Sequence, residues 1–176
     1  LDSKEPIVLY QGGFAVHRGL PELIEAARHL SRGVVVLMGW GQLEGELREK
    51  IAADGLEDRV VIIGPATPEE LPVVTAGADV GVIPYQAVGL NNYYTTPNKL
   101  FEYIASGIAV AGSHFPELCR IIETYEIGVT FDPHQPRDMA RAINELLENP
   151  ELLATMRANT TAAAGELVWE RQVTGL

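Results

Sequence analysis

The chain has 176 residues, 47% of them hydrophobic and 21% charged, a balance that suits one globular domain with a sizeable core. The net charge of −11 argues against broad binding to nucleic acids or anionic membranes, although it leaves room for a local cationic pocket. Cys119 is the only cysteine, which excludes an internal disulfide and a cysteine metal cluster. With neither a long apolar run nor a signal peptide, we expect a cytoplasmic protein, whose full-length form could lie at the inner face of the membrane.

The sequence begins at Leu1 without a methionine and leads almost at once into an apolar run. We expect a piece of a larger protein, cut in a linker near Leu1–Glu5, with a trimmed mature protein as the weaker alternative. Residues 1–176 are expected to form a single domain. The tail at residues 166–176, which carries Trp169, reads as the start of another helix that could pack on a missing N-terminal domain.

Short apolar runs bounded by glycine, proline and polar residues predict six β-strands. Between them, apolar residues recur at helical spacing, and prolines and acidic residues stand where helices begin. The expected strands are residues 6–10, 33–38, 59–63, 79–84, 108–111 and 128–131. The expected helices are residues 20–30, 43–53, a short one opening at 67–71, a central one entered at 96–99, then 117–123, 137–148 and 150–164.

Strands and helices therefore alternate along the whole chain. The strands are continuous apolar runs, as expected when helices cover both faces of a sheet. This pattern predicts an α/β fold with an open, doubly wound parallel sheet of about six strands, Rossmann-like and built as three α/β/α layers.

Residues 85–107 pass from a tyrosine-rich loop into the central helix. Thr96 is the expected N-cap and Pro97 the first helical residue. Unpaired backbone N–H groups point out of such a helix start, which makes it a ready anion site. Glu102 lies one turn inside, on a polar face, where a carboxylate can accept hydrogen bonds from hydroxyl groups. The apolar stripe of this helix is expected to be Leu100, Phe101, Ile104 and Ala105.

If the strands follow the order 3-2-1-4-5-6, the loops after the first and fourth strands meet where the order reverses, and ligands bind at that point. The first of these loops contains Gly12 and Gly13, where backbone can approach a ligand closely, and Arg18, whose guanidinium can bind phosphate. The second leads to Lys99 and Glu102. We therefore expect a site for the phosphates and sugar of a nucleotide diphosphate.

The chain contains, in this order, the stretches LYQGGFAVHRGL, VVVLMGWG, RVVIIGPATPEELP, ADVGVIPY, PNKLFEYIASGIAV, PEL, GVTFDP and WERQ. Together they resemble the C-terminal, donor-binding domain of group 1 retaining glycosyltransferases of GT-B fold. The resemblance covers nearly the whole chain, and its most telling pieces are PNKLFEYIASG and the turn that runs from the paired glycines to RGL.

The resemblance implies roles for individual residues. Glu102 matches the second glutamate of a motif with seven residues between two glutamates, which binds the donor ribose. Arg18 matches the basic residue that neutralises the donor diphosphate, so Arg18 and Glu102 are the implied catalytic residues. The resemblance also implies that Gly12 lies at the donor after the first strand, that Gly64, Pro65 and Ala66 line the base pocket, and that backbone N–H groups around Asn98 and Lys99 hold phosphate. Gly13 in the first loop and Thr96 at the helix start are expected donor-binding residues from their positions alone.

The chain departs from the family pattern at two positions. Tyr94 stands where the first glutamate of the motif is expected, and in many members that glutamate contacts the donor sugar. Gly13 stands where an arginine usually follows the strand-one glycine, which leaves one diphosphate cation fewer in that loop. Lys99 could compensate for it.

Several of these residues also have plainer interpretations. Glu102 taken alone is more often a solvated helix residue, and Lys99 more often a surface lysine, so Lys99 ranks below Arg18. The Gly39-Trp40-Gly41 stretch lacks the third glycine of a dinucleotide fingerprint and is interpreted as a turn. Tyr93 and Tyr94 could form a sugar platform or could pack against a missing domain. The histidines are too scattered for a metal site.

The sequence thus predicts a domain that binds the nucleotide-sugar donor, such as a UDP- or GDP-sugar, in a glycosyltransferase that transfers a sugar to a hydroxyl of a glycan or a lipid-linked glycan. No cofactor, metal or nucleic acid is expected, and the chain alone is expected to bind nucleotide weakly without turnover. A sugar-nucleotide epimerase of the same fold and a non-catalytic nucleotide-binding or interaction domain remain the alternatives.

Overall fold

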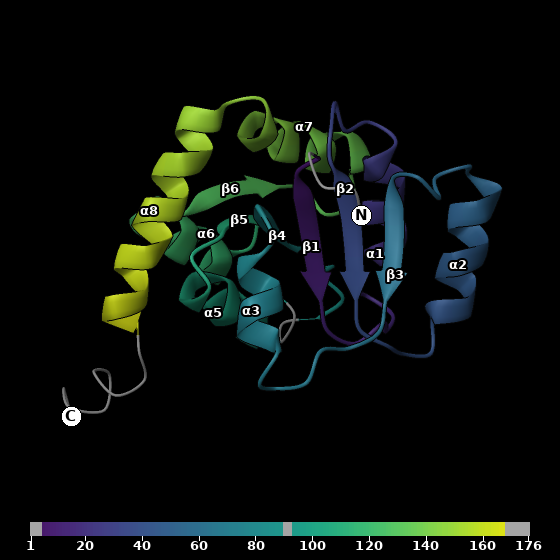
Figure 1. The fold of residues 1–176 in the computed structure, drawn as a ribbon, viewed down its shortest axis with the longest axis horizontal. Coiled ribbons are helices and arrows are strands. Elements are labelled where there is room, and N and C mark those ends of the chain that lie inside the picture. The colour runs from purple at the N-terminus through teal and green to yellow at the C-terminus, as the bar shows by residue number, and fades with distance from the viewer. Residues whose placement is uncertain (1–4, 90–92, 168–176) are drawn as a thin grey trace.

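A computed structural model describes residues 5–89 and 93–167. Within these residues, six parallel strands form one sheet in the order β3-β2-β1-β4-β5-β6 (Figure 1). This is the predicted doubly wound sheet, and its strand order reverses between β1 and β4. The strands are β1 (Ile7–Gln11), β2 (Val34–Met38), β3 (Val60–Ile63), β4 (Val80–Ile83), β5 (Ala109–Ser113) and β6 (Gly128–Phe131).

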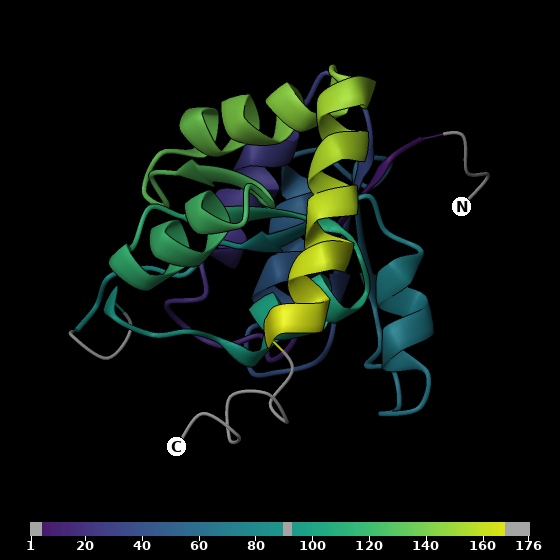
Figure 2. The ribbon, with the colours of Figure 1, turned by 90° about the vertical axis from the view of Figure 1, so that its left-hand side faces the viewer.

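Helices cover both faces of the sheet (Figures 1 and 2). One face carries α1 (Leu20–Ala27), α2 (Glu44–Ala53) and α7 (Pro136–Leu147). The other carries α3 (Leu71–Ala76), α5 (Asn98–Ala105) and α6 (Pro116–Thr124). The long helix α8 (Pro150–Leu167) packs along α5 and against the end of α7. The result is the expected arrangement of three layers.

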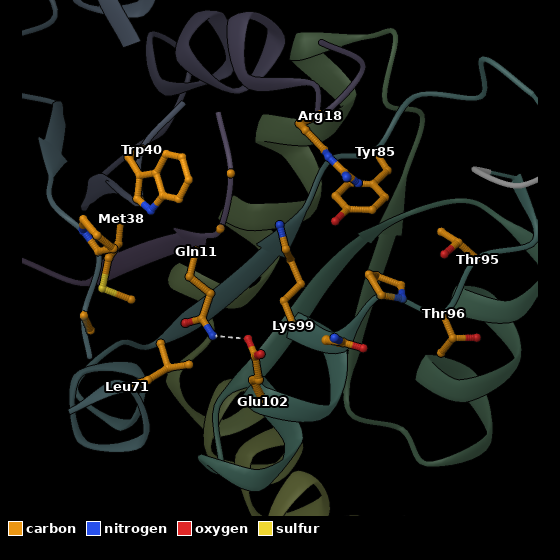
Figure 3. Close-up of a pocket in the computed structure, with 17 residues that line it drawn as sticks. Gln11, Arg18, Met38, Trp40, Leu71, Tyr85, Thr95, Thr96, Lys99 and Glu102 are labelled. Atoms are coloured by element: carbon orange, nitrogen blue, oxygen red, sulfur yellow. Dashed lines mark hydrogen bonds between the residues drawn. The ribbon is translucent and has the colours of Figure 1, made fainter. Parts of the chain in front are cut away.

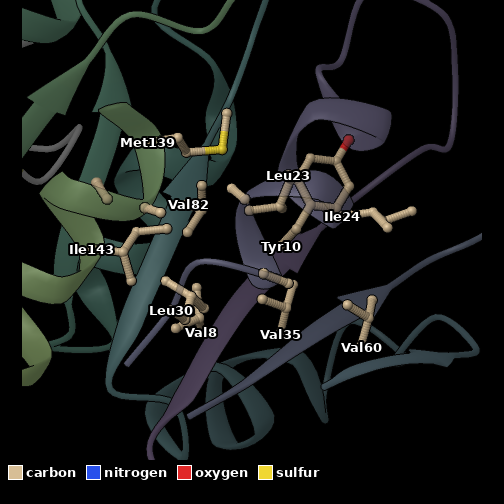
Figure 4. Packing of buried hydrophobic residues seen from close by; sticks show 14 of the residues in the cluster. Val8, Tyr10, Leu23, Ile24, Leu30, Val35, Val60, Val82, Met139 and Ile143 are labelled. Carbon is tan, nitrogen blue, oxygen red and sulfur yellow. The ribbon is translucent and has the colours of Figure 1, made fainter. Parts of the chain in front are cut away.

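The core lies in two parts, one on each side of the sheet, because successive side chains of a strand point to opposite faces. In β1, Val8 and Tyr10 pack toward α1 and α7, as Figure 4 shows, whereas Leu9 packs toward α5. All five residues of β2 are buried, and so are the four of β4. Burial on both faces explains why these strands are continuous apolar runs in the sequence.

The predicted start of the central helix was wrong by one residue. Pro97, at φ −71° and ψ 145°, is the N-cap, and α5 begins at Asn98, with no side chain capping it. Thr96 lies before the cap. The extended backbone of Pro97 lets its carbonyl oxygen accept the first hydrogen bond, from the Leu100 N–H at 2.9 Å.

The short third helix also begins later than predicted, at Leu71. Thr67 and Glu70 instead form a turn in which each holds the other: the Thr67 N–H donates to the Glu70 carboxylate at 3.0 Å, and the Glu70 N–H donates to the Thr67 hydroxyl at 3.3 Å. This is the reciprocal pattern of a capping box. Hydrogen bonding from the Thr67 backbone N–H, and after it from the Thr67 hydroxyl, lowers the pKa of the exposed Glu70 carboxyl.

The predicted apolar stripe of the central helix was partly wrong. Leu100 and Ile104 are buried, but Phe101 is 37% exposed, and Tyr103 is buried completely in its place. Gly81 on β4 makes this possible, because a Cβ there would overlap the Tyr103 ring. The polar hydroxyl of Tyr103 concealed its role as a core residue.

No helix in residues 5–89 and 93–167 has the length and apolarity needed to cross a membrane. The predicted helix 150–164 is confirmed and continues to Leu167, so it includes the first residues of the predicted tail. Trp169 and the rest of that tail lie outside the described residues.

Candidate functional site

A cleft of about 560 Å³ opens at the carboxyl edge of the sheet, where the strand order reverses (Figure 3). All strands are parallel, so the loops that follow them meet at this one edge. The cleft is lined by residues that end or follow β1, β2, β3 and β4, and by the first turns of α5: Gln11, Gly12, Gly13, Arg18, Met38, Gly39, Trp40, Pro65, Ala66, Leu71, Tyr85, Thr95, Thr96, Pro97, Asn98, Lys99 and Glu102.

The loop after β1 is fixed to the loop after β4. The Gln86 N–H donates to the carbonyl oxygen of His17 at 3.1 Å. Gly19 has φ 67°, and a Cβ at this position would overlap the Pro84 carbonyl, so only glycine allows the two loops to lie this close. This contact brings the guanidinium of Arg18 over the ring of Tyr85, 4.3 Å from its centre.

Lys99 lies at the centre of the cleft and is only 7% exposed. Its Nζ stands 3.8 Å from the centre of the Tyr10 ring and 4.9 Å from that of Tyr85. Two cations therefore share the Tyr85 ring, and within the described part of the chain neither Arg18 nor Lys99 forms an ion pair. Aromatic faces attract cations but do not neutralise them.

Burial shifts the proton affinity of this cluster. Loss of hydration, helped by the nearby charge of Arg18, lowers the pKa of Lys99 to about 7. Burial also raises the pKa of Tyr10 and, more weakly, that of Tyr85, so both rings stay uncharged at neutral pH. The cleft thus holds a permanent cation in Arg18 and a second cation whose charge depends on its surroundings.

The N-terminus of α5 opens into the same space. Pro97 and Asn98 line the cleft, and the amides of Asn98 and Lys99 stand in the first turn, where a helix offers them no partner. The helix dipole adds partial positive charge at this end. Two side-chain cations and a helix N-terminus therefore face one volume, which is the arrangement that holds a phosphate group.

Beside these cations stands the carboxylate of Glu102. Its Oε2 accepts a hydrogen bond of 2.5 Å from Nε2 of Gln11, the last residue of β1 (dashed in Figure 3). The hydroxyl of the neighbouring Tyr103 lies between β1 and β4: it accepts from the Gln11 N–H at 3.3 Å and stands 3.1 Å from the Leu9 carbonyl oxygen. These contacts attach α5 to the floor of the cleft.

The end of the cleft away from Thr95 and Thr96 is apolar (Figure 3). The exposed Trp40 stands at its rim, with 67% of its surface accessible. The other residues of this end are Met38, Pro65, Ala66 and Leu71. A flat apolar group fits this end, whereas an anion fits the other.

Residues 1–163 match the family described as glycosyl transferases group 1. The chain belongs to this family. Alpha-D-kanosaminyltransferase of Streptomyces kanamyceticus is 31% identical over 167 residues, which are 90% of this chain and 40% of that protein. The chain spans only about two fifths of the length of the curated relatives it matches, with 40% and 37% in two of them.

Solved structures share the fold. Sucrose-phosphate synthase from Thermosynechococcus elongatus superposes with a TM-score of 0.85 at 27% identity, over 99% of this chain and 45% of that one. HepE of Anabaena, solved in complex with UDP-glucose, gives a TM-score of 0.81 at 21% identity, over 98% and 50%. The low identity of the second match supports the fold alone.

The structure brings most of the predicted site residues of this group 1 domain together. Gly64 is exposed and is not among the cleft-lining residues of the described chain. Lys99, expected at the surface, is buried, because it lies against the rings of Tyr10 and Tyr85. The predicted residues that line the cleft are Gly12, Gly13, Arg18, Pro65, Ala66, Thr96, Asn98, Lys99 and Glu102.

Sequence reasoning missed other residues of the cleft. Gly39 and Trp40 were interpreted as a plain turn, although β2 lies beside β1 and its carboxyl end opens at the same edge. The predicted strand at residues 6–10 stops before Gln11, although Gln11 ends β1 and is 3% exposed. A polar side chain at the end of an apolar strand was the available signal. Tyr85 was noted only as the start of the loop.

Tyr93 and Tyr94 belong to the loop in which the chain departs from the family pattern, and neither is among the residues that line the cleft. Tyr94 is 57% exposed, and Tyr93 packs edge-on against it, with ring centres 5.1 Å apart. The Tyr93 ring also lies tilted against Phe115, with ring centres 5.3 Å apart. Tyr94 therefore supplies no charge at the position of the missing glutamate. In residues 5–89 and 93–167, no group of three histidine, cysteine, aspartate or glutamate side chains is placed to hold a metal ion.

Proposed function

We propose that this chain is the donor-binding domain of a retaining glycosyltransferase, which transfers a sugar from a nucleoside diphosphate sugar to an acceptor hydroxyl. The observation that carries the proposal is the order of chemistry along the cleft. Apolar side chains occupy one end, the carboxylate of Glu102 stands in the middle, and two cations with the start of α5 stand next to it.

A nucleoside diphosphate sugar has matching parts in the same order. The base fits the apolar end beside Trp40, in a cleft that Pro65 and Ala66 also line. The ribose 2′-hydroxyl reaches Glu102, which can accept its hydrogen bond. The diphosphate then lies between Arg18, Lys99 and the amides at the start of α5.

These groups also suit the chemistry. When the bond between the sugar and the diphosphate breaks, negative charge grows on the leaving phosphate oxygens. Fixed cations and amides that surround this charge stabilise the transition state more than the ground state. Lys99 takes over the charge that an arginine at the position of Gly13 would supply, since it is the second cation at the phosphates.

The acceptor site belongs to the part of the protein that the relatives have and this chain does not cover. The acceptor is a hydroxyl of a glycan or lipid-linked glycan, which would approach from the open side of the cleft. Relatives of this chain are named for transfer of kanosamine and for inositol phosphate glycosylation, and HepE was solved with UDP-glucose. This range supports a nucleotide-sugar donor and leaves the base and sugar to experiment.

Calorimetric titration of the chain with UDP, GDP and their sugars tests the proposal. We expect weak binding of one of them, and no sugar transfer by the chain alone. Arg18→Ala and Glu102→Ala should each weaken binding about 10- to 100-fold, since each removes a charge-assisted contact. Arg48→Ala and Glu49→Ala on the exposed side of α2 make the same chemical changes away from the cleft and serve as controls.

The titrations have clear contrary outcomes. If no nucleoside diphosphate binds, the donor-site assignment is wrong. If one binds with equal affinity to the wild type and to both cleft variants, the ligand lies elsewhere on the domain. Turnover by the isolated chain would contradict the proposal that it supplies only half of the active site.

A further inference from the structure

Gln11 has a distinctive place beside the carboxylate of Glu102. It is the last residue of the central strand β1, it is 3% exposed, and its side chain lies between two other side chains. On one side, Nε2 donates to Glu102 Oε2 at 2.5 Å, and on the other, the hydroxyl of the fully buried Thr75 on α3 lies 2.8 Å from Oε1. Three elements therefore meet in one hydrogen-bonded row.

The chemistry of the row permits only one orientation of the Gln11 amide. An ionised carboxylate can only accept hydrogen bonds, so the amide nitrogen must face Glu102 and the amide oxygen must face Thr75. The reverse orientation would set two oxygens against each other. Thr75 then donates its single proton to Gln11, although the Leu71 carbonyl oxygen of its own helix lies 2.7 Å away.

The backbone of the row is equally fixed. The Gln11 N–H donates to the Tyr103 hydroxyl at 3.3 Å, so adjacent residues of α5 are held by the main chain and the side chain of one residue. Oε2 of Glu102 is engaged by Gln11, whereas Oε1 has no hydrogen-bond partner within the described part of the chain. Glu102 is thus held with one oxygen available to the cleft.

We propose that Gln11 is a positioning residue that holds the Glu102 carboxylate toward the ribose 2′-hydroxyl and so sets the preference of the site for ribonucleotides over 2′-deoxynucleotides. The inference rests on the proposed function. Without Gln11, the carboxylate would be free to rotate, and ligand binding would have to fix its position again. Such ordering weakens affinity only for ligands that contact the carboxylate.

The test is a titration of wild type and Gln11→Leu with UDP and 2′-deoxy-UDP, and with GDP and 2′-deoxy-GDP, using the pair that the wild type binds. Leucine is close to glutamine in size but cannot donate. We expect Gln11→Leu to weaken ribonucleotide binding about tenfold and 2′-deoxynucleotide binding less than about twofold. In the Glu102→Ala background, the same replacement should change ribonucleotide affinity less than about twofold, because the partner is gone.

Controls separate positioning from general damage. Gln42→Leu makes the same replacement at an exposed position outside the cleft, and it should leave both affinities unchanged. If Gln11→Leu does not fold, Thr75→Val removes only the hydroxyl that orients Gln11, and about a threefold loss for the ribonucleotide alone is expected.

Equal losses for both ligands, or unchanged affinities, would overturn the role of Gln11. If Glu102→Ala still weakens binding in that case, the proposed function stands without it. If the wild type binds none of the four nucleotides, the proposed function fails and the role of Gln11 fails with it.

Discussion

Binding of the donor to this cleft should take up a proton at Lys99. In the empty cleft, burial and the nearby Arg18 lower the pKa of Lys99 to about 7. A bound diphosphate would place negative charge beside the ammonium group and raise that pKa again. Below about pH 7 the lysine is charged in both states, whereas above it the free protein must gain a proton to bind.

The size of the effect follows from this linkage. If the bound diphosphate raises the pKa of Lys99 above about 10, the fall in affinity should approach tenfold for each pH unit above about 8 and reach roughly 50-fold between pH 7 and pH 9. At about pH 8, some 0.9 protons should enter per molecule bound. Arg18 stays charged throughout this range and adds nothing to the slope.

Calorimetry of a nucleotide sugar that has no titrating phosphate, in two buffers of different ionisation enthalpy, measures the proton count directly. Lys99→Met keeps the length and apolar body of the side chain but removes the charge, so this variant should bind more weakly and with no slope above pH 7. An equal slope in wild type and Lys99→Met, or no proton uptake by the wild type, would show that Lys99 does not gain a proton on binding and would refute the reasoning.

Three further predictions concern the free protein and the cleft rim. Lys99→Met should raise the free energy of unfolding, measured by urea denaturation at neutral pH, by at most about 5 kcal/mol. The reason is that the buried lysine has a pKa of about 7 instead of 10.5, and each pKa unit is worth about 1.4 kcal/mol. The wild-type penalty should shrink as pH rises from about 7 to 10.5, and a constant difference between the two proteins would contradict this cause. Gly81→Ala should destabilise by about 1–3 kcal/mol, because its methyl group meets the Tyr103 ring, whereas Gly45→Ala on α2 meets nothing within 4 Å and should stabilise by up to about 1 kcal/mol. Nucleotide binding should change tryptophan fluorescence in wild type but much less in Trp40→Phe, and an equal change in both would place the base away from Trp40.

Most of the fold could be predicted from the sequence because its strands are buried on both faces. Continuous apolar runs such as Gly33–Met38 exclude an exposed sheet face, and helical segments between them require parallel connections. Element ends were less predictable, as at Thr96 and Pro97. A proline in extended conformation can cap a helix as well as begin one, and local sequence does not decide between these roles.

The sequence predicted those site residues whose role depends on their position along the chain. Arg18 and Glu102 follow strands that meet at the reversal of strand order, so topology alone brings them to one cleft. Lys99 was misjudged because its burial depends on Tyr10 and Tyr85, which belong to other elements. Gln11 was missed for the same reason: its role comes from Thr75 and Glu102, which lie 64 and 91 residues away in sequence.

Because the Tyr103 hydroxyl lies between β1 and β4, the cleft floor can loosen at one hydrogen bond without unfolding of the sheet. The β1–β4 register covers two residue pairs and stops at Leu9 and Gly81, whereas the β1–β2 register covers five. Beyond that point, the Gln11 amide is held by a side-chain hydroxyl instead of a neighbouring strand. A small shift of α5 would therefore release this amide while the sheet stays folded. Its hydrogen-exchange rate would report how often the floor loosens, separately from global unfolding.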